Sequence, residues 1–507
     1  MPQSAQNTAL FLYNKKKFFN TYNNRFQNVG NSIESTLTEI ANLTDYFTLA
    51  NLELIESEFT HLFTSLKQRR QENEDTFWAY CYYLASTLYY FYDAYGQKKK
   101  ADDYQQFRTE IRDFIENRTL PQAKDEEAFI DHLMGSFREG ITNLIKSPFH
   151  LSKLRDYVGF TNLCRLYWVF CRLTLTSGFN LARNLQWIAK LDQVLGTKTD
   201  VDKIITTFQA PNGILNYFSV GLFLTRFLMD AGMLIKHTFF PDENERRSNY
   251  STRWERFKFE LNQRQYRLAN DFVWANVNFL TNFNQLVGIS NALAGYLTAG
   301  FLCFDVSLLL YRMYNTYRDY QVKKAQYNQE LNDLGVEPSN QKDILEKQLA
   351  ELEKEWEIKK ATLSYLSGAA AILASGFAAA LLLALPAITV ASYFMCTIAV
   401  AMYFTGDRFS QFKTAQLTLE EQDPQNDLQA YERALKEYQI ARNDLIFNLV
   451  KHTVAPSILI ASFAICWPIA VVLTAIYLGS ELLHSKNQHA EKQEVNRMAI
   501  DASPAVM

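Results

Sequence analysis

The stretch that decides the fold runs from Ala361 to Gly406 and reads ATLSYLSGAAAILASGFAAALLLALPAITVASYFMCTIAVAMYFTG. It contains no charged side chain and is about twice as long as the ~20 apolar residues that a helix needs to cross a bilayer. Pro386 stands near its middle, and proline interrupts the helical hydrogen-bond ladder. The stretch therefore predicts two membrane helices, about 363–385 and 387–405, with a hairpin turn at Pro386. The alternative, one continuous kinked helix, is too long for a bilayer.

Two further apolar stretches predict membrane spans on either side of this hairpin. Leu286–Tyr311 is interrupted only by Asp305, and Thr453–Ser480 has no charged side chain. Both are long enough to cross ~30 Å of hydrocarbon. The chain therefore carries four predicted spans.

Two charged connectors, 312–360 and 407–452, separate these spans. Each is divided by a break, at 335–340 and at 420–427, and leucines and aromatic residues follow the break at heptad-like spacing. We expect each connector to form an antiparallel, coiled-coil-like stalk that binds a protein partner. Both stalks are expected on the membrane side opposite the Pro386 turn, and the even number of spans places both chain termini opposite the stalks.

The N-terminal part, 1–150, is predicted to be a soluble helical domain. Its segment 76–96 carries a thick aromatic stripe at helical spacing. Such a stripe is typical of a core helix, and a lipid-facing or partner-binding surface is the alternative.

The part that follows, 151–270, is predicted to be helical and either membrane-apposed or partly spanning. Its two apolar stretches, 157–179 and 214–235, have the length of a span, but each contains two charged residues. A charge at mid-bilayer costs roughly 2.5–3.5 kcal/mol on insertion scales, so lying at the membrane surface explains these stretches as well as spanning does. The charged segment 241–267 is expected in water or at headgroups.

These observations predict an all-α protein: an N-terminal soluble helical domain followed by a polytopic helical membrane domain with two long antiparallel stalks. The expected divisions of the chain are 1–150, 151–270, 271–333, 334–385, 386–420, 421–484 and a polar tail at 485–507.

Composition excludes several classes of protein. The net charge of −3 argues against a nucleic-acid-binding protein, which would carry a strongly basic domain. The six cysteines are scattered without C-x-x-C spacing, and the seven histidines are dispersed, so we expect no disulfide framework and no metal site. No phosphate-binding loop, zinc-protease motif, nucleophile elbow or dinucleotide fingerprint occurs, so no catalytic residue and no cofactor is predicted.

A few polar residues within apolar stretches are candidate site residues. Arg226 and Asp230 are four apart on a predicted helix and can pair, and Asp305 is an acid inside a predicted span. Together they form a candidate intramembrane polar site, with an ordinary ion pair or an interfacial position as the alternatives. Arg165 and Arg172 are seven apart and share a helical face, so they are candidates for contact with lipid phosphates, with structural pairing to acids elsewhere as the alternative.

The C-terminal tail HSKNQHAEKQEVNRMAIDASPAVM has Glu491 and Glu494 in a mixed-charge stretch and then small and apolar residues at its end. This tail resembles the translocation signals of type IV secreted effectors of Legionella- and Coxiella-like bacteria, and the helical domains with membrane hairpins are similar to that group. The resemblance implies an effector that acts in a host organelle membrane.

The leading functional hypothesis is a non-enzymatic integral membrane protein that binds protein partners or organises a membrane through its stalks. The second is a transporter or channel with a polar path formed by Arg226, Asp230, Asp305 and the asparagine-rich segment 276–285. The third is a membrane enzyme without a known motif. The sequence leaves homo-oligomerisation open.

Overall fold

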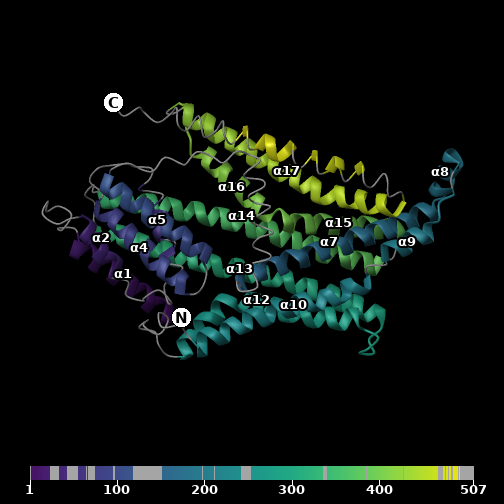
Figure 1. Ribbon diagram of the computed structural model, residues 1–507, viewed down its shortest axis with the longest axis horizontal. Helices are drawn as coiled ribbons and strands as arrows, with labels where there is room; N and C mark the ends of the chain where they lie inside the picture. The colour runs from purple at the N-terminus through teal and green to yellow at the C-terminus, as the bar shows by residue number, and fades with distance from the viewer. Residues whose placement is uncertain are drawn as a thin grey trace.

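The computed structural model describes residues 2–22, 33–42, most of 55–117, 151–465 apart from short gaps, and parts of 472–491. Within these residues every regular element is an α-helix and no strand occurs, which confirms the all-α fold class. Figure 1 shows an elongated molecule: the N-terminal helices lie at one end, and longer helices run side by side toward the other.

The N-terminal helices that the structure describes are α1 (Pro2–Tyr22), α2 (Ile33–Asn42), α4 (Asp75–Ala94) and α5 (Lys98–Asn117). We call them the N-terminal group. The aromatic stripe lies on α4 and is a core helix, as predicted, because Trp78, Tyr80 and Tyr92 are at most 2% exposed. The segment 118–150 of the predicted domain lies outside the described residues.

Helices α13 (Asn291–Leu334) and α14 (Asn340–Leu383) form a long antiparallel hairpin. Each has 44 residues, which corresponds to about 66 Å at 1.5 Å per residue. Each helix therefore contains an apolar half and a charged half without a break, as the predicted spans and stalks require. In the charged half Leu345 and Leu352 pack against Tyr327, and the rings of Tyr320 and Trp356 stack with centroids 5.2 Å apart.

Helix α15 (Pro386–Phe404) follows α14 after a very short turn, and Pro386 is its first residue. Its position costs no hydrogen bond, since the first amides of a helix have no intrahelical partner. The two helices approach closely at Gly376, where a Cβ atom would lie 3.0 Å from the Ser392 carbonyl oxygen and from Cys396 Sγ. Small residues permit such a close approach inside lipid.

Helices α16 (Gly406–Glu420) and α17 (Leu428–Ile465) form the second hairpin. The Lys354 Nζ atom of α14 lies 2.6 Å from Glu421 Oε2, at the end of α16. The turn of the second stalk therefore lies beside the first stalk, and both stalks extend toward the same end of the molecule (Figure 1).

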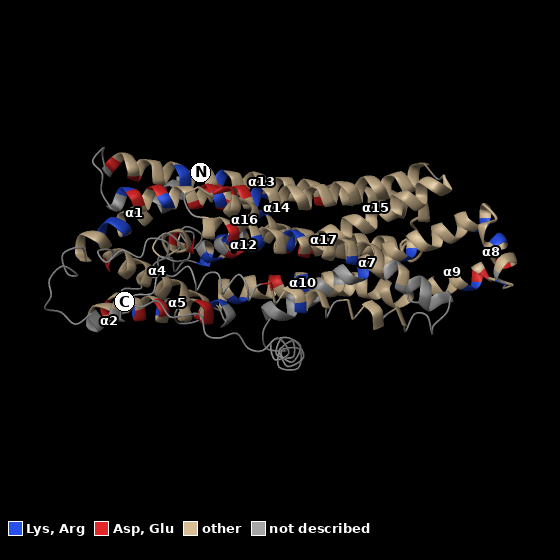
Figure 2. Cartoon of the chain, turned by 90° about the horizontal axis from the view of Figure 1, so that it is seen from above, with Lys and Arg blue, Asp and Glu red and all other residues tan. Residues whose placement is uncertain are grey.

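Helices α7 (Leu151–Asn184), α10 (Asn212–Phe239) and α12 (Arg253–Asn282) lie alongside α13 and α15. The Tyr167 ring of α7 meets Phe404, and Trp274 of α12 donates a hydrogen bond to Asp305 of α13. The short helices α8 (Trp187–Leu195) and α9 (Val201–Gln209) lie at the end remote from the N-terminal group (Figures 1 and 2).

Among the described residues, four stretches are long and apolar enough to cross a membrane: Asn291–Asp333, Lys342–Leu383, Pro386–Phe404, and Val201–Phe239, which comprises α9 and α10 and of which residues 210–211 are not described. We use the term apolar layer for residues 291–311, 361–383 and 386–404 and for the parts of neighbouring helices level with them. Figure 2 shows that Lys, Arg, Asp and Glu are concentrated around the N-terminal group and the stalks, whereas the apolar parts of α13, α14 and α15 are nearly free of them. The architecture therefore supports a membrane protein.

The structure corrects several details of the sequence analysis. The first predicted span begins at Asn291 and not at 286, because the chain turns at 283–290 with Gly288 in the left-handed region (φ 71°). The predicted span 387–405 does not continue into the second stalk as one helix, because Thr405 has non-helical backbone angles (φ −101°, ψ 8°). Part of the predicted span 453–480 lies outside the described residues.

The expected position of the N-terminus is wrong. The N-terminal group packs on the first stalk, since Lys15 of α1 contacts Glu330 of α13 and Ile344 of α14 belongs to the same core as α4. The parity argument fails because α7, α10 and α12 also run along the apolar layer. They cross the layer three times, from the stalk side at the start of α7 to the remote side, where α13 begins.

The close approach at Gly376 leads to a testable prediction. We expect Gly376→Val to separate α14 from α15 and to destabilise the protein by roughly 1–3 kcal/mol, the usual cost of overpacking. Gly368→Val is the matched control on the same helix, because a Cβ at Gly368 meets nothing within 4 Å. Thermal unfolding in detergent measures both variants, and equal loss of stability in the two would contradict the packing described.

Candidate functional site

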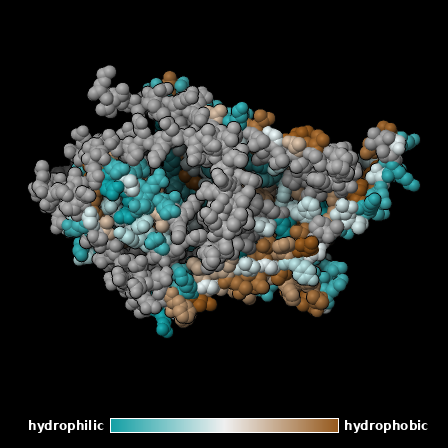
Figure 3. All heavy atoms as spheres, viewed as in Figure 1, coloured by the Kyte–Doolittle hydropathy of each residue, from teal (hydrophilic) through white to brown (hydrophobic). Residues whose placement is uncertain are grey.

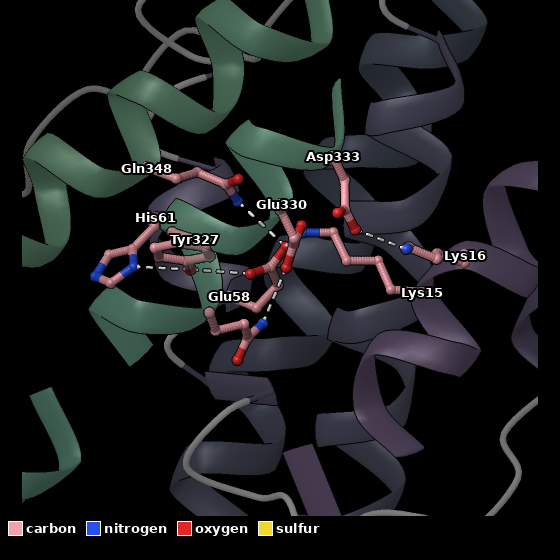
Figure 4. A network of polar contacts seen from close by, with 9 residues as sticks. Lys15, Lys16, Glu58, His61, Tyr327, Glu330, Asp333 and Gln348 are labelled. Carbon is pink, nitrogen blue, oxygen red and sulfur yellow. Dashed lines mark hydrogen bonds and ion pairs between the residues drawn. The ribbon is translucent and has the colours of Figure 1, made fainter. Parts of the chain in front are cut away.

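A buried network of charged and polar side chains joins the N-terminal group to the first stalk (Figure 4). The Lys15 Nζ atom lies 2.6 Å from Glu58 Oε1 and 2.9 Å from Glu330 Oε2. The side chains of Lys15 and Glu58 are only 11% and 2% exposed. These contacts bring together α1, the helical residues 58–63 and the end of α13.

Further donors complete the surroundings of Glu58. The Tyr327 hydroxyl donates to Glu58 Oε2 at 2.9 Å, and Gln348 Nε2 donates to Oε1 at 3.3 Å. His61 lies beside this group, with Nε2 2.9 Å from an oxygen of Glu355 on α14. We call these residues the docking network, with these members: Lys15, Glu58, His61, Tyr327, Glu330, Gln348 and Glu355.

The pKa values of the central pair follow from these contacts. Burial opposes the charged form of Glu58, but the Lys15 ammonium and the donors Tyr327 and Gln348 hold its pKa below the ordinary value. Burial likewise opposes the charged form of Lys15, yet Glu58 and Glu330 hold its pKa above the ordinary value. Both groups are therefore charged at neutral pH, and each depends on the other for that state.

A second set of buried charges lies between α10 and α12. Arg226 Nη2 is 3.1 Å from Asp271 Oδ1, and Arg264 is 3.2 Å from Asp230 and 2.8 Å from Glu260. The three carboxylate side chains are at most 2% exposed. We call these five residues the α10–α12 seam. The predicted site residues Arg226 and Asp230 are thus both placed in ion pairs between the two helices.

The outward face of α10 is apolar, in contrast to the seam. Ile214, Tyr217 and Leu228 are 65%, 70% and 59% exposed. Figure 3 shows hydrophobic atoms over the α10 and α12 region of the surface. A helix whose charged side chains pair with a neighbouring helix and whose outer side chains are apolar is suited to a lipid environment, because an unpaired charge in lipid is costly.

The structure does not bring Asp305 into the seam. Its Oδ1 accepts a hydrogen bond of 2.7 Å from the Trp274 indole nitrogen of α12. It therefore lies in the apolar layer between α12 and α13, about one turn from the level of Asp271. The predicted polar path is thus divided into a paired seam and a separate carboxylate.

Arg165 and Arg172 lie on α7 and are both partly exposed. Arg165 stands two residues before Tyr167, which meets Phe404 at the stalk end of α15. Arg165 is therefore level with the edge of the apolar layer, where lipid phosphates would lie. Arg172 lies within the layer, one residue after the buried Cys171. The contact with lipid phosphates stays a prediction for both.

The sequence analysis identifies none of the docking network and only two of the five seam residues, Arg226 and Asp230. The segment 241–267 is expected in water or at headgroups, but Glu260 of this segment is 1% exposed and Arg256 is 6% exposed. A signal for this was available: charges inside the apolar stretch 214–235 require partners, and the nearest charge-rich helix along the chain is the one that supplies them. For Lys15 and Glu330, 315 residues apart, no comparable signal exists.

No group of His, Cys, Asp and Glu with the arrangement of a metal site occurs in the part of the chain that the structure describes. No protein-family model, no curated protein and no solved structure matches the chain. The site is therefore interpreted from its own geometry.

We expect Lys15→Met to weaken the attachment of the N-terminal group to the stalk by roughly 3–5 kcal/mol, because it leaves the buried Glu58 carboxylate without its cation. The adjacent Lys16→Met is the matched control. Lys16 pairs with Asp333 at 3.1 Å, but the two side chains are 64% and 52% exposed, so the expected loss is at most about 1 kcal/mol. Limited proteolysis of the full-length protein, together with its thermal unfolding, measures the difference.

The pH dependence gives a further check on this pair. Because the pKa of Glu58 is lowered on folding, its contribution is present above the ordinary glutamate pKa of about 4.3 and is lost as the pH falls through the lower folded value. The gap in stability between the wild type and Lys15→Met should therefore shrink in acid. A gap independent of pH would show that the ion pair does not hold the two parts together.

For the α10–α12 seam, we expect Asp271→Asn to cost roughly 3–5 kcal/mol, because it leaves Arg226 buried beside a neutral amide. Asp202→Asn is the control: Asp202 pairs with Arg183 at 2.8 Å, but its side chain is 82% exposed. The measurement is the midpoint of thermal unfolding in detergent. Equal midpoints for the two variants would mean that the seam does not stabilise the helix pair.

Proposed function

We propose that the protein is a non-enzymatic membrane-anchored scaffold that binds protein partners through its stalks. Its apolar helices hold it in a bilayer, and the stalks carry the N-terminal group away from the membrane. The observation that supports this most strongly is the docking network, which fixes a soluble helical group to the far end of two unbroken membrane helices.

The two stalks differ in what remains accessible to a partner. One side of the first stalk, 312–360, is covered by the N-terminal group through contacts at Tyr327, Glu330 and Ile344. The second stalk, 407–452, exposes large apolar side chains, among them Leu428 at 58% and Ile446 at 53%. The second stalk is therefore the better candidate for a protein partner.

A transporter or channel is the second candidate, and Asp305 is the observation that favours it. Asp305 is a carboxylate in the apolar layer that accepts a hydrogen bond from Trp274. An acid in such a layer is a candidate ion or proton site. The α10–α12 seam weighs against it, since its charges are neutralised by ion pairs between neighbouring helices. A flux assay in liposomes with the wild type and Asp305→Asn separates the two candidate functions. The scaffold proposal predicts that neither protein carries a flux.

The resemblance of the tail to type IV translocation signals supports a further part of the proposal, a secreted effector that acts in a host organelle membrane. We expect removal of 485–507 to abolish delivery from a bacterium with a type IV secretion system. A reporter enzyme fused to the N-terminus measures delivery, and membrane insertion of the truncated chain is the control for folding. Unchanged delivery would remove the effector part of the proposal and leave the scaffold part intact.

The partner surface is tested with a photo-crosslinking residue in the full-length protein in its membrane. We expect protein adducts from positions 428 and 446, whose side chains are exposed, and none from Leu352, which is 3% exposed. An adduct of twice the mass of the chain identifies a homo-oligomer as the partner. The absence of any adduct at 428 and 446 would contradict partner binding by the second stalk.

A further inference from the structure

Helix α8 has one apolar face that no part of the described structure covers. Trp187, Leu191 and Val194 recur at steps of four and three, so they share a face; Gln193 lies on the opposite side, and Lys190 lies at the edge of the apolar face beside Val194. The three apolar side chains are 60%, 56% and 82% exposed. Apolar side chains in this number on a nine-residue helix call for an apolar environment.

The backbone on both sides of α8 directs it away from the bundle. Gln186 has a left-handed conformation (φ 58°), which is uncommon for a residue other than glycine, and Gly196 ends the helix with φ 65°. Asp192 then accepts hydrogen bonds from the backbone amide and the hydroxyl of Thr199, at 2.9 and 2.6 Å. As a result, α8 lies across the long axis of the molecule in both views (Figures 1 and 2).

The contacts of α7 fix the level at which α8 begins. Tyr167 meets Phe404 and Thr174 Oγ1 lies 3.4 Å from Thr397 Oγ1, so α7 runs antiparallel to α15. When this antiparallel pairing is continued along both helices, Asn184 at the end of α7 is level with Pro386 at the start of α15. Helix α8 therefore begins where the apolar layer ends, on the side remote from the stalks.

The surface of the apolar layer continues to this edge. Leu382 in the last turn of α14, Leu385 just before α15 and Leu286 in the turn before α13 lie at the same end and are 66%, 55% and 79% exposed. The apolar face of α8 thus adjoins the lipid-facing surface of the bundle, and Lys190 lies at the edge of that face. A tryptophan at the boundary and a lysine at the edge of the apolar face are typical of helices that lie in a membrane interface.

We infer that α8 is an interfacial helix that binds the headgroup region of the leaflet remote from the stalks. Trp187, Leu191 and Val194 insert at the boundary between headgroups and acyl chains, Gln193 faces water, and the Lys190 side chain extends from the edge of the apolar face toward the headgroups. The inference rests on the proposed membrane anchoring. It adds a second attachment, in the plane of the membrane, at the end opposite the N-terminal group.

The test uses an environment-sensitive fluorophore on single cysteines in the full-length protein, with the six native cysteines replaced. The protein is reconstituted in phosphatidylcholine vesicles with bromine either near the top or near the end of the acyl chains. The labelled sites are Val194→Cys and its neighbour on the opposite face, Gln193→Cys. Leu382→Cys reports on the edge of the apolar layer, and Glu346→Cys reports on the stalk.

We expect blue-shifted emission at position 194 and quenching mainly by bromine near the top of the chains, since an interfacial helix buries its apolar face about 5–10 Å deep. Positions 193 and 346 should emit as in water. If position 382 is quenched and position 194 is not, the protein is anchored but α8 does not bind the membrane. If neither is quenched, membrane anchoring itself is contradicted. A blue shift at 194 without any quenching would indicate that protein, such as a second copy, covers the face.

Discussion

A charge that is withdrawn from water must meet an opposite charge or hydrogen-bond donors, and this constraint governs two places in the molecule, the first stalk and the α10–α12 helix pair. At the stalk, Glu58 is buried and is held by Lys15, Tyr327 and Gln348. Between α10 and α12, Arg226 meets Asp271 and Asp230 meets Arg264. An ion pair is satisfied in one helical register only, so these contacts fix how the helices align where apolar packing alone would tolerate a shift.

The two sets of charges lie in different surroundings. The docking network is enclosed by a core rich in aromatic side chains, whereas the α10–α12 seam lies between two helices, and the outer face of α10 is apolar. In both cases neighbouring protein atoms exclude water from the carboxylates. The same pairing chemistry therefore joins the N-terminal group to the first stalk and closes the α10–α12 helix pair.

The sequence predicted where the helices lie along the chain better than it predicted which helices pack together. The uncharged stretch 361–406 became α14 and α15, and the aromatic stripe 76–96 became the core helix α4, because helical period and charge are local properties. The pairing of Lys15 with Glu330 was beyond prediction, because a pattern shows which face of a helix is buried and not which partner buries it. The side on which the N-terminus lies was mispredicted for a related reason: α12 carries enough charge to look solvated until its partner on α10 is known.

The unbroken course of α13 and α14 has a mechanical consequence. Since each helix extends from the N-terminal group into the apolar layer without a hinge in its described residues, a tilt imposed at one end is transmitted along the whole length to the other. The pair can therefore act as a stiff lever. In a bilayer, a force on the N-terminal group would tilt the apolar halves of both helices, and with them the α14–α15 hairpin.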